Sequence, residues 1–192
     1  MDTKIALIGT IIDDVIHGYD GTVKESLGGI FYNLSIFSAI VDVNTTIFPI
    51  CNVGYNIWER VREELVRFPN VSSKGLKKVR QRNNRVNLKY FHRERRVEIL
   101  KNLVPRIHFD QVLPFLDSDI ILINFISGFE LSIDDLETIR STCKSTIYMD
   151  IHSLTLGIDE QGKRVPRKLW NWERWVSCAD IIQLNENELS VI

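Results

Sequence analysis

Continuous apolar runs alternate with amphipathic segments along most of the chain. The run at 4–12 predicts a strand buried on both faces, the usual state in a parallel sheet. Runs at 45–54 and 118–125 predict two more buried strands, and those at 145–151 and 179–184 predict further strands. Apolar residues at helical spacing predict helices over 30–41, 56–68, 132–142 and 166–178. The alternation of the two predicts an α/β layered fold with a mostly parallel sheet.

Two segments instead show hairpin signals. Residues 14–27 flank the turn former Asp20-Gly21, and residues 85–100 alternate apolar and polar positions on either side of HRERR. Hairpins cannot continue a parallel sheet, so we expect the two to pair into a small separate sheet. Ligands of open α/β sheets bind beyond the carboxyl ends of the strands. The hairpins would then act as a lid over that edge, within one domain spanning 1–192.

Composition narrows the classes of function. The chain has 192 residues, 44% of them apolar, and a net charge of −1, so no global field points to nucleic acid or a membrane. The N-terminus lacks the pattern of a signal peptide, and no apolar run approaches the length of a membrane span. The three cysteines are far apart and form no CxxC motif, so we expect reduced thiols and a cytoplasmic protein.

Polar and glycine residues cluster where predicted strands end or helices begin. The carboxyl ends of predicted strands carry Asp13, Asp14, Gly54, Asp150 and Asn185. The stretch SLGGIFYN places Gly28 and Gly29 before a helix and Asn33 in its first turn. Glycines let a ligand approach the backbone, while the Asn33 amide and Asp14 carboxylate suit the hydroxyls of a neutral polyol. The alternative is a tight turn before a core helix, with Asn33 only capping it.

The order of these motifs resembles the ribokinase-like (PfkB-type) sugar and nucleoside kinases. In that family a first strand ends in Asp, and a hairpin leads to a Gly-Gly-x-x-x-Asn turn, here residues 28–33. Near the other end, DIIQLNENEL resembles the family's strand before an Asn-x-x-Glu motif, here Asn185 and Glu188. On these residues alone, Asn185 and Glu188 could equally form a plain capping box at a helix start.

The resemblance implies ATP-dependent phosphorylation of a sugar or nucleoside hydroxyl. It implies that Asp14, Gly28, Gly29 and Asn33 bind the substrate. Asn185 and Glu188 would organise the Mg²⁺ and phosphate region through water, with no direct metal ligand, because Mg²⁺ dehydrates reluctantly. Asp150 opens a run in which relatives carry Asp-x-Asn-x-Arg; His152 replaces the Asn, so we assign that run no role.

The family's catalytic Asp lies in a Gly-x-Gly-Asp turn after the Asn-x-x-Glu motif. No such sequence occurs before Ile192. We therefore expect a truncated chain without the C-terminal nucleotide-binding part, with no catalytic residue of its own and no turnover when purified alone.

Two other functions remain open. The chain could be a catalytically dead sugar-binding or dimerisation module, with the lid hairpins as a homodimer interface. Residues 74–106 carry twelve Lys and Arg against two Glu, with aromatic residues interleaved, and such a segment can bind nucleic acid. The alternative is that these basic residues only face solvent on the surface of the lid. We expect a small molecule rather than nucleic acid as the partner.

Overall fold

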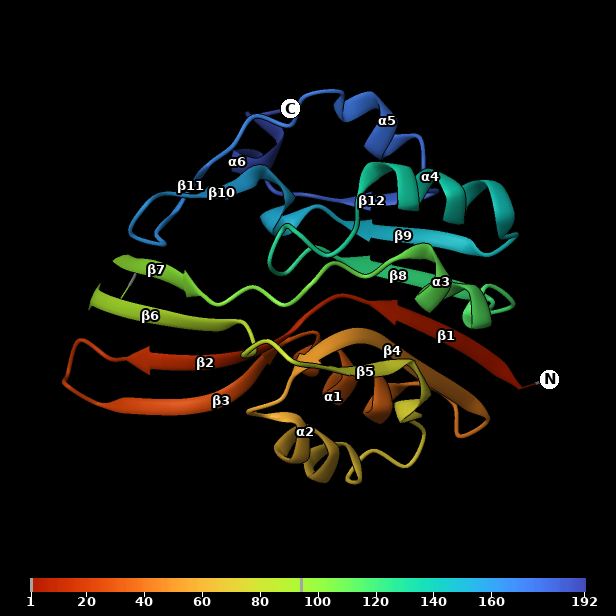
Figure 1. Cartoon of the computed structure of the whole chain (residues 1–192), viewed down its shortest axis with the longest axis horizontal. Helices are drawn as coiled ribbons and strands as arrows, with labels where there is room; N and C mark the ends of the chain where they lie inside the picture. Colours follow the sequence, from red (N-terminus) through yellow and green to blue (C-terminus); the bar gives the residue numbers. More distant parts are fainter. Residues whose placement is uncertain (1, 94) are drawn as a thin grey trace.

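The computed structural model describes residues 2–93 and 95–192. Its main sheet has six parallel strands in the order β12-β9-β8-β1-β4-β5, and their carboxyl ends point toward a second, smaller sheet (Figure 1). In chain order the strands are β1 (Thr3–Ile8), β4 (Thr45–Gly54), β5 (Leu76–Val79), β8 (Ile120–Asn124), β9 (Thr146–Asp150) and β12 (Ile181–Gln183). The predicted α/β layered fold is confirmed.

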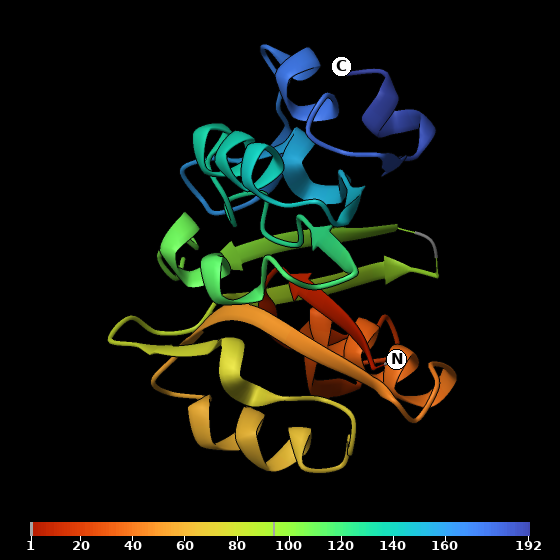
Figure 2. The ribbon, with the colours of Figure 1, turned by 90° about the vertical axis from the view of Figure 1, so that its right-hand side faces the viewer.

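Helices lie on both faces of this sheet, as the view along the strands shows (Figure 2). On one face, α1 (Ile30–Ile40) and α2 (Trp58–Leu65) bury a core that includes Leu7 and Ile47. On the other, α3 (Phe109–Val112), α4 (Ile133–Thr142) and α5 (Trp172–Val176) bury a core that includes Ile8, Ile121 and Met149. The short α6 (Glu186–Leu189) follows β12.

The second sheet is the predicted lid. It has the order β3-β2-β6-β7, from β2 (Ile11–His17), β3 (Val23–Gly29), β6 (Arg85–His92) and β7 (Arg95–Lys101). The two hairpins join through parallel pairing of β2 with β6, in which Asp14 lies opposite Val86. The expectation that the hairpins pair with each other is therefore confirmed. A two-stranded hairpin of β10 (Leu156–Ile158) and β11 (Arg164–Pro166) contacts β7 through a bridge between Ile99 and Lys163.

The predicted single strand over 4–12 is wrong. The chain leaves the main sheet after Ile8 and enters the lid at Ile11. The break lies at Gly9, where a Cβ would stand 2.3 Å from Cγ2 of Ile30, so the chain passes close against the start of α1. Asp13 and Asp14 consequently lie inside a lid strand and not at the end of a main-sheet strand.

Two further predictions need correction. The helix expected over 166–178 is only the five-residue α5, because residues 164–166 form β11 and Asn171 adopts a left-handed φ of 57°. The strands β8 and β9 are buried on one face only. Their other face opens on an apolar groove of about 600 Å³, at whose rim Ile40 is 70% and Ile181 is 51% exposed. Among the described residues, no helix has the length and apolar character needed to cross a membrane.

Candidate functional site

A cavity of about 340 Å³ lies between the lid and the carboxyl ends of the main-sheet strands. Three parts of the chain supply its polar lining. The lid contributes Asp14, Arg96 and Glu98, the start of α1 contributes Gly29 and Asn33, and the ends of β8 and β9 contribute Asn124, Asp150 and His152. Ile12, Val86 and Ile126 form an apolar wall. The structure thus brings Asp14, Gly29 and Asn33, predicted from the sequence, to one cavity.

Asp14 is buried in this cavity, with 8% of its surface exposed. Burial, together with the neighbouring charges of Glu98 and Asp13, raises the pKa of its carboxyl to about 6, while Arg96 opposes the shift. Among the described residues, no hydrogen-bond donor reaches the carboxylate. A buried carboxylate without a protein partner is costly, and ligand hydroxyls donating to it would remove that cost.

Asp13 has a different environment, because successive side chains of a strand point to opposite faces. Its carboxylate accepts from Nη1 of Arg85 at 2.7 Å and lies 3.4 Å from Nη1 of Arg60. Asp13 is 4% exposed, so it is a buried ion-paired residue and not a solvated one. It holds the lid against α2, while Asp14 faces the cavity.

Each position of the Gly-Gly turn requires glycine for a different structural reason. A Cβ on Gly28 would lie 1.8 Å from Oδ2 of Asp14, so Gly28 makes room for that carboxylate. Gly29 has a φ of 63°, and a Cβ there would lie 2.2 Å from the carbonyl oxygen of Thr10. Gly28 is not part of the cavity lining, whereas Gly29 is.

Asn33 does not cap α1, which begins after Gly29 without a side-chain cap bond. Its Oδ1 instead accepts from Nδ2 of Asn124 at 3.2 Å, inside the cavity. The remaining amide groups of the pair offer both donors and acceptors to a ligand.

Asn185 and Glu188 border a second cavity of about 480 Å³. They form the reciprocal capping box of α6: Glu188 N–H donates to Asn185 Oδ1 at 3.0 Å, and Asn185 N–H donates to Glu188 Oε2 at 2.9 Å. Arg96, Glu98 and His152 line both cavities, so the two adjoin. The Gly-Gly-x-x-x-Asn and Asn-x-x-Glu motifs, far apart in the sequence, therefore lie at neighbouring cavities.

The capping box limits how Glu188 could hold a metal ion. Both of its carboxylate oxygens accept hydrogen bonds from Asn185, and Oε1 lies 3.8 Å from Nδ1 of His152. Within residues 2–93 and 95–192, no group of three or more His, Cys, Asp and Glu is placed to ligate a metal. Contact with Mg²⁺ through water fits this arrangement, since water can bond to a carboxylate lone pair that the box leaves free.

The sequence did not single out several lining residues. Asn124 is the last residue of β8 and the second-to-last of the strand predicted at 118–125, so its position near a carboxyl end was a usable signal. Arg96 and Glu98 are two residues apart on a strand, so their side chains lie on the same face. The many other Lys and Arg residues of segment 74–106 made this pair hard to distinguish in the sequence. Asp150 ends β9, and burial, with the charge of Glu188, raises the pKa of its carboxyl, while His152 opposes.

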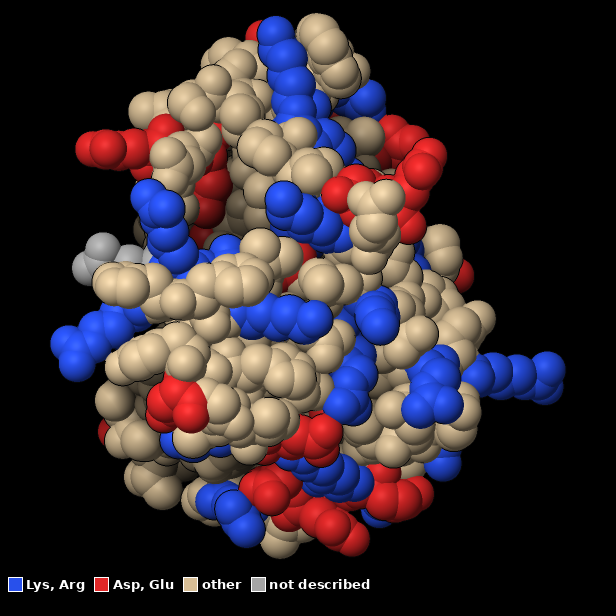
Figure 3. Space-filling model, turned by 90° about the vertical axis from the view of Figure 1, so that its left-hand side faces the viewer, with Lys and Arg blue, Asp and Glu red and all other residues tan. Residues whose placement is uncertain are grey.

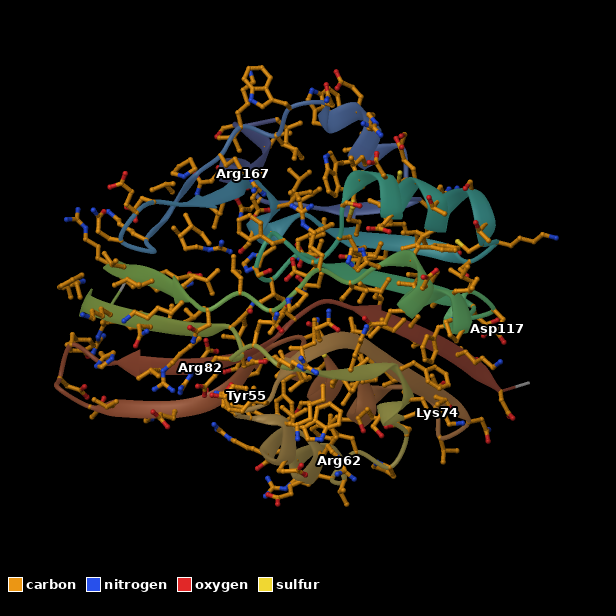
Figure 4. The ribbon with its side chains drawn as sticks, viewed as in Figure 1. Tyr55, Arg62, Lys74, Arg82, Asp117 and Arg167 are labelled. Atoms are coloured by element: carbon orange, nitrogen blue, oxygen red, sulfur yellow. The ribbon has the colours of Figure 1, made fainter. Side chains whose placement is uncertain are left out.

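The basic segment 74–106 is divided between several surroundings. Arg85 pairs with Asp13 and with Glu25, and Lys78 lies 3.7 Å from Glu59. On the face in Figure 3, Lys and Arg side chains gather across the middle of the molecule, with most Asp and Glu above and below them. Figure 4 shows Arg82 near Tyr55, whose backbone N–H donates to the carbonyl oxygen of Gln81 at 3.2 Å. Tyr55 is half exposed and does not line the cavity beneath the lid.

Similarity to known proteins is found at the level of structure. No family model and no curated protein sequence matches the chain. A pyrophosphate-dependent kinase in the ribokinase family, solved as a sulfate complex, matches 98% of this chain and 64% of its own length, with a TM-score of 0.79 and 17% identity. A pyrophosphate-dependent myo-inositol kinase with altered specificity matches 98% of this chain and 62% of its own length, with a TM-score of 0.78 and 17% identity.

A sugar kinase from Pyrococcus horikoshii, also solved in complex with ATP, matches 98% of this chain and 64% of its own length, with a TM-score of 0.70 and 18% identity. The chain therefore spans less than two thirds of the length of these kinases. At such identities the likeness shows the fold. The chain has the ribokinase-like fold that its motifs predicted.

Proposed function

We propose that the cavity beneath the lid binds a sugar or nucleoside, and that the reaction served by this fold is ATP-dependent phosphorylation of one of its hydroxyls. One observation carries the proposal: Asp14 presents a buried carboxylate, to which no described residue donates a hydrogen bond, to a polar-lined cavity. Asn33 of α1 and Asn124 of β8 add amide groups to the same lining. The sugar and nucleoside kinases with the same fold support the substrate class.

The cavity has the character of a polyol site. Its volume of about 340 Å³ falls within the range of small-molecule sites. Carboxylate and amide groups there can bond to several hydroxyls, since each hydroxyl donates and accepts. The apolar wall of Ile12, Val86 and Ile126 would contact the carbon-bound face of a sugar ring or a base.

The donor would approach from the second cavity. Asn185 and Glu188 border it, and Glu188 would hold Mg²⁺ through water. When bound, the ion would neutralise phosphate charge during transfer. We propose ATP as the donor, supported by the ATP complex of a kinase with this fold. Two structural neighbours are pyrophosphate-dependent, so both donors belong in the experiment.

We assign no catalytic base within these 192 residues, so ligand binding is the direct test. Calorimetry with a panel of pentoses, hexoses, inositols and nucleosides should find at least one that binds saturably. Asn33→Ala should lower the affinity for that ligand by about tenfold, because the variant loses hydrogen bonds to a polar substrate. The exposed Asn44→Ala is the matched control. Absence of binding across the panel would contradict the proposal.

Turnover is measured alongside, with ATP and with pyrophosphate, in the presence of Mg²⁺. We expect binding without turnover from this chain alone. That result would also be given by a sugar-binding module that is catalytically dead. Turnover with pyrophosphate but not ATP would overturn the proposed donor and leave the substrate site standing.

A further inference from the structure

Two side chains connect the cavities and differ from the rest of their lining. Among the described residues that line either cavity, Arg96 is the one arginine or lysine, and His152 is the one histidine. Asp14, Glu98, Asp150 and Glu188 are all carboxylates in the same lining. An anion that enters here meets a positively charged side chain at Arg96 and an imidazole hydrogen-bonding group at His152.

Arg96 reaches this position from the lid. Its Nη1 donates to the hydroxyl of Tyr90 at 2.9 Å, and its guanidinium lies 5.8 Å from the centre of the Tyr90 ring. The bond to Tyr90 uses one of five N–H donors and orients the others. The adjacent Glu98 lies 3.6 Å from Nε of the buried Arg164, which offsets part of its negative charge toward an incoming anion.

His152 reaches the same position from the main sheet. It begins the 3-10 turn after β9 with a φ of 33°, a backbone conformation that non-glycine residues rarely adopt. Such strain persists where surrounding structure imposes it and is concentrated at functional sites. The turn leaves the imidazole about half exposed at the junction of the cavities.

We propose that Arg96 and His152 together bind the phosphoryl group in transit between the donor and the substrate hydroxyl. The assignment rests on the proposed function for its ligand, but the pair's affinity for a phosphate anion can be measured without any turnover. Arg96 supplies charged, planar donors that match phosphate oxygens, and His152 supplies a ring N–H from the opposite side. Because Arg96 lies on the lid and His152 on the main sheet, a phosphate held by both also fixes the lid over the substrate.

The test is binding of orthophosphate and pyrophosphate to the full chain, by calorimetry, with and without Mg²⁺. Arg96→Gln should lower the affinity for pyrophosphate by about tenfold or more. His152→Gly removes the imidazole ring, and glycine tolerates the positive φ at this position. This variant should lose affinity for pyrophosphate several-fold. Arg95→Gln is the control. It removes the same charge from the preceding residue of β7, whose side chain points to the other, outer face of the lid. Its affinity should stay within about twofold of the parent chain's.

A second readout reports the site directly. In protein with isotope-labelled histidine, pyrophosphate should shift the ring resonances of His152, identified by their absence from His152→Gly, more than those of His17, His92 and His108. Thermal unfolding of each variant verifies that it is folded. Equal affinity in Arg96→Gln and Arg95→Gln, or no saturable binding by the parent chain in either buffer, would overturn the proposal. Anion binding at this pair without binding of any sugar or nucleoside would support it and count against the proposed function alone.

Discussion

Replacing Asp14 with Asn should stabilise the ligand-free protein at neutral pH. Folding moves this carboxyl from water into a lid cavity and raises its pKa from 3.8 to about 6. The native state therefore binds the proton more tightly than the unfolded state does between these values. Its contribution to stability is fully present below about pH 4 and is lost as the pH rises through about 6. Asn cannot ionise, so the variant does not suffer this loss.

The magnitude follows from that interval. The rise in the pKa of Asp14 from 3.8 to about 6, at about 1.4 kcal/mol per pKa unit, corresponds to a loss of about 3 kcal/mol of stability at high pH. Water that enters the cavity screens the carboxylate and reduces this to about 2 kcal/mol. Urea unfolding at pH 4 and pH 7.5 measures it. Between the two, the free energy of unfolding of Asp14→Asn should rise by about 2 kcal/mol relative to that of the parent chain.

Asp13→Asn is the control, because its carboxylate is ion-paired with Arg85 at 2.7 Å. Removing it leaves the guanidinium without that partner and should destabilise the protein at pH 7.5 by about 1 kcal/mol or more. If Asp14→Asn is instead destabilised at pH 7.5 and keeps the pH dependence of the parent, Asp14 has a structural partner. It could not then be an unsatisfied carboxylate reserved for a ligand.

Three other substitutions test the fold and the second motif. Gly29→Ala should cost about 2 kcal/mol or more in urea unfolding, because φ is 63° and its Cβ would meet the Thr10 carbonyl; a neutral effect would contradict the described turn. Ile121→Ala should cost about 2–4 kcal/mol, whereas Ile181→Ala, on the open sheet face, should cost under about 1 kcal/mol, and similar losses would show that this face is covered. Glu188→Ala should cost about 1 kcal/mol through the lost capping box and leave sugar affinity unchanged, so a large drop in sugar affinity would place Glu188 in the substrate site.

Much of the architecture was predictable because hydrophobic periodicity is a local property. The run at 45–54 is a strand as predicted, and its Pro49 is tolerated because β5 pairs with β4 only from Cys51 onward. The helix predicted over 132–142 forms as α4, and Ser132 caps it by accepting a hydrogen bond from the N–H of Asp135, three residues on. Both hairpins form where turn residues and alternation indicate them.

The errors arise where tertiary contacts decide. Nothing in the apolar run 4–12 shows that Gly9 must bend around Ile30, which sends Asp14 into the lid. The alternation of exposure in β8 and β9 depends on which helices cover each face, and that is not encoded within either strand. Likewise, Arg96 and His152 meet at one junction only because two separate sheets face each other there.

The central claim is that the Asp14 carboxylate recognises the hydroxyls of a sugar or nucleoside. The most direct measurement is calorimetric titration of one such ligand into the parent chain, Asp14→Asn and Asp20→Asn, at pH 7.5. Asp20 is an exposed carboxylate in the lid turn that bonds to Thr22, so it controls for charge alone. We predict that affinity falls at least about tenfold in Asp14→Asn and is unchanged in Asp20→Asn. Equal affinity in all three proteins would contradict the claim.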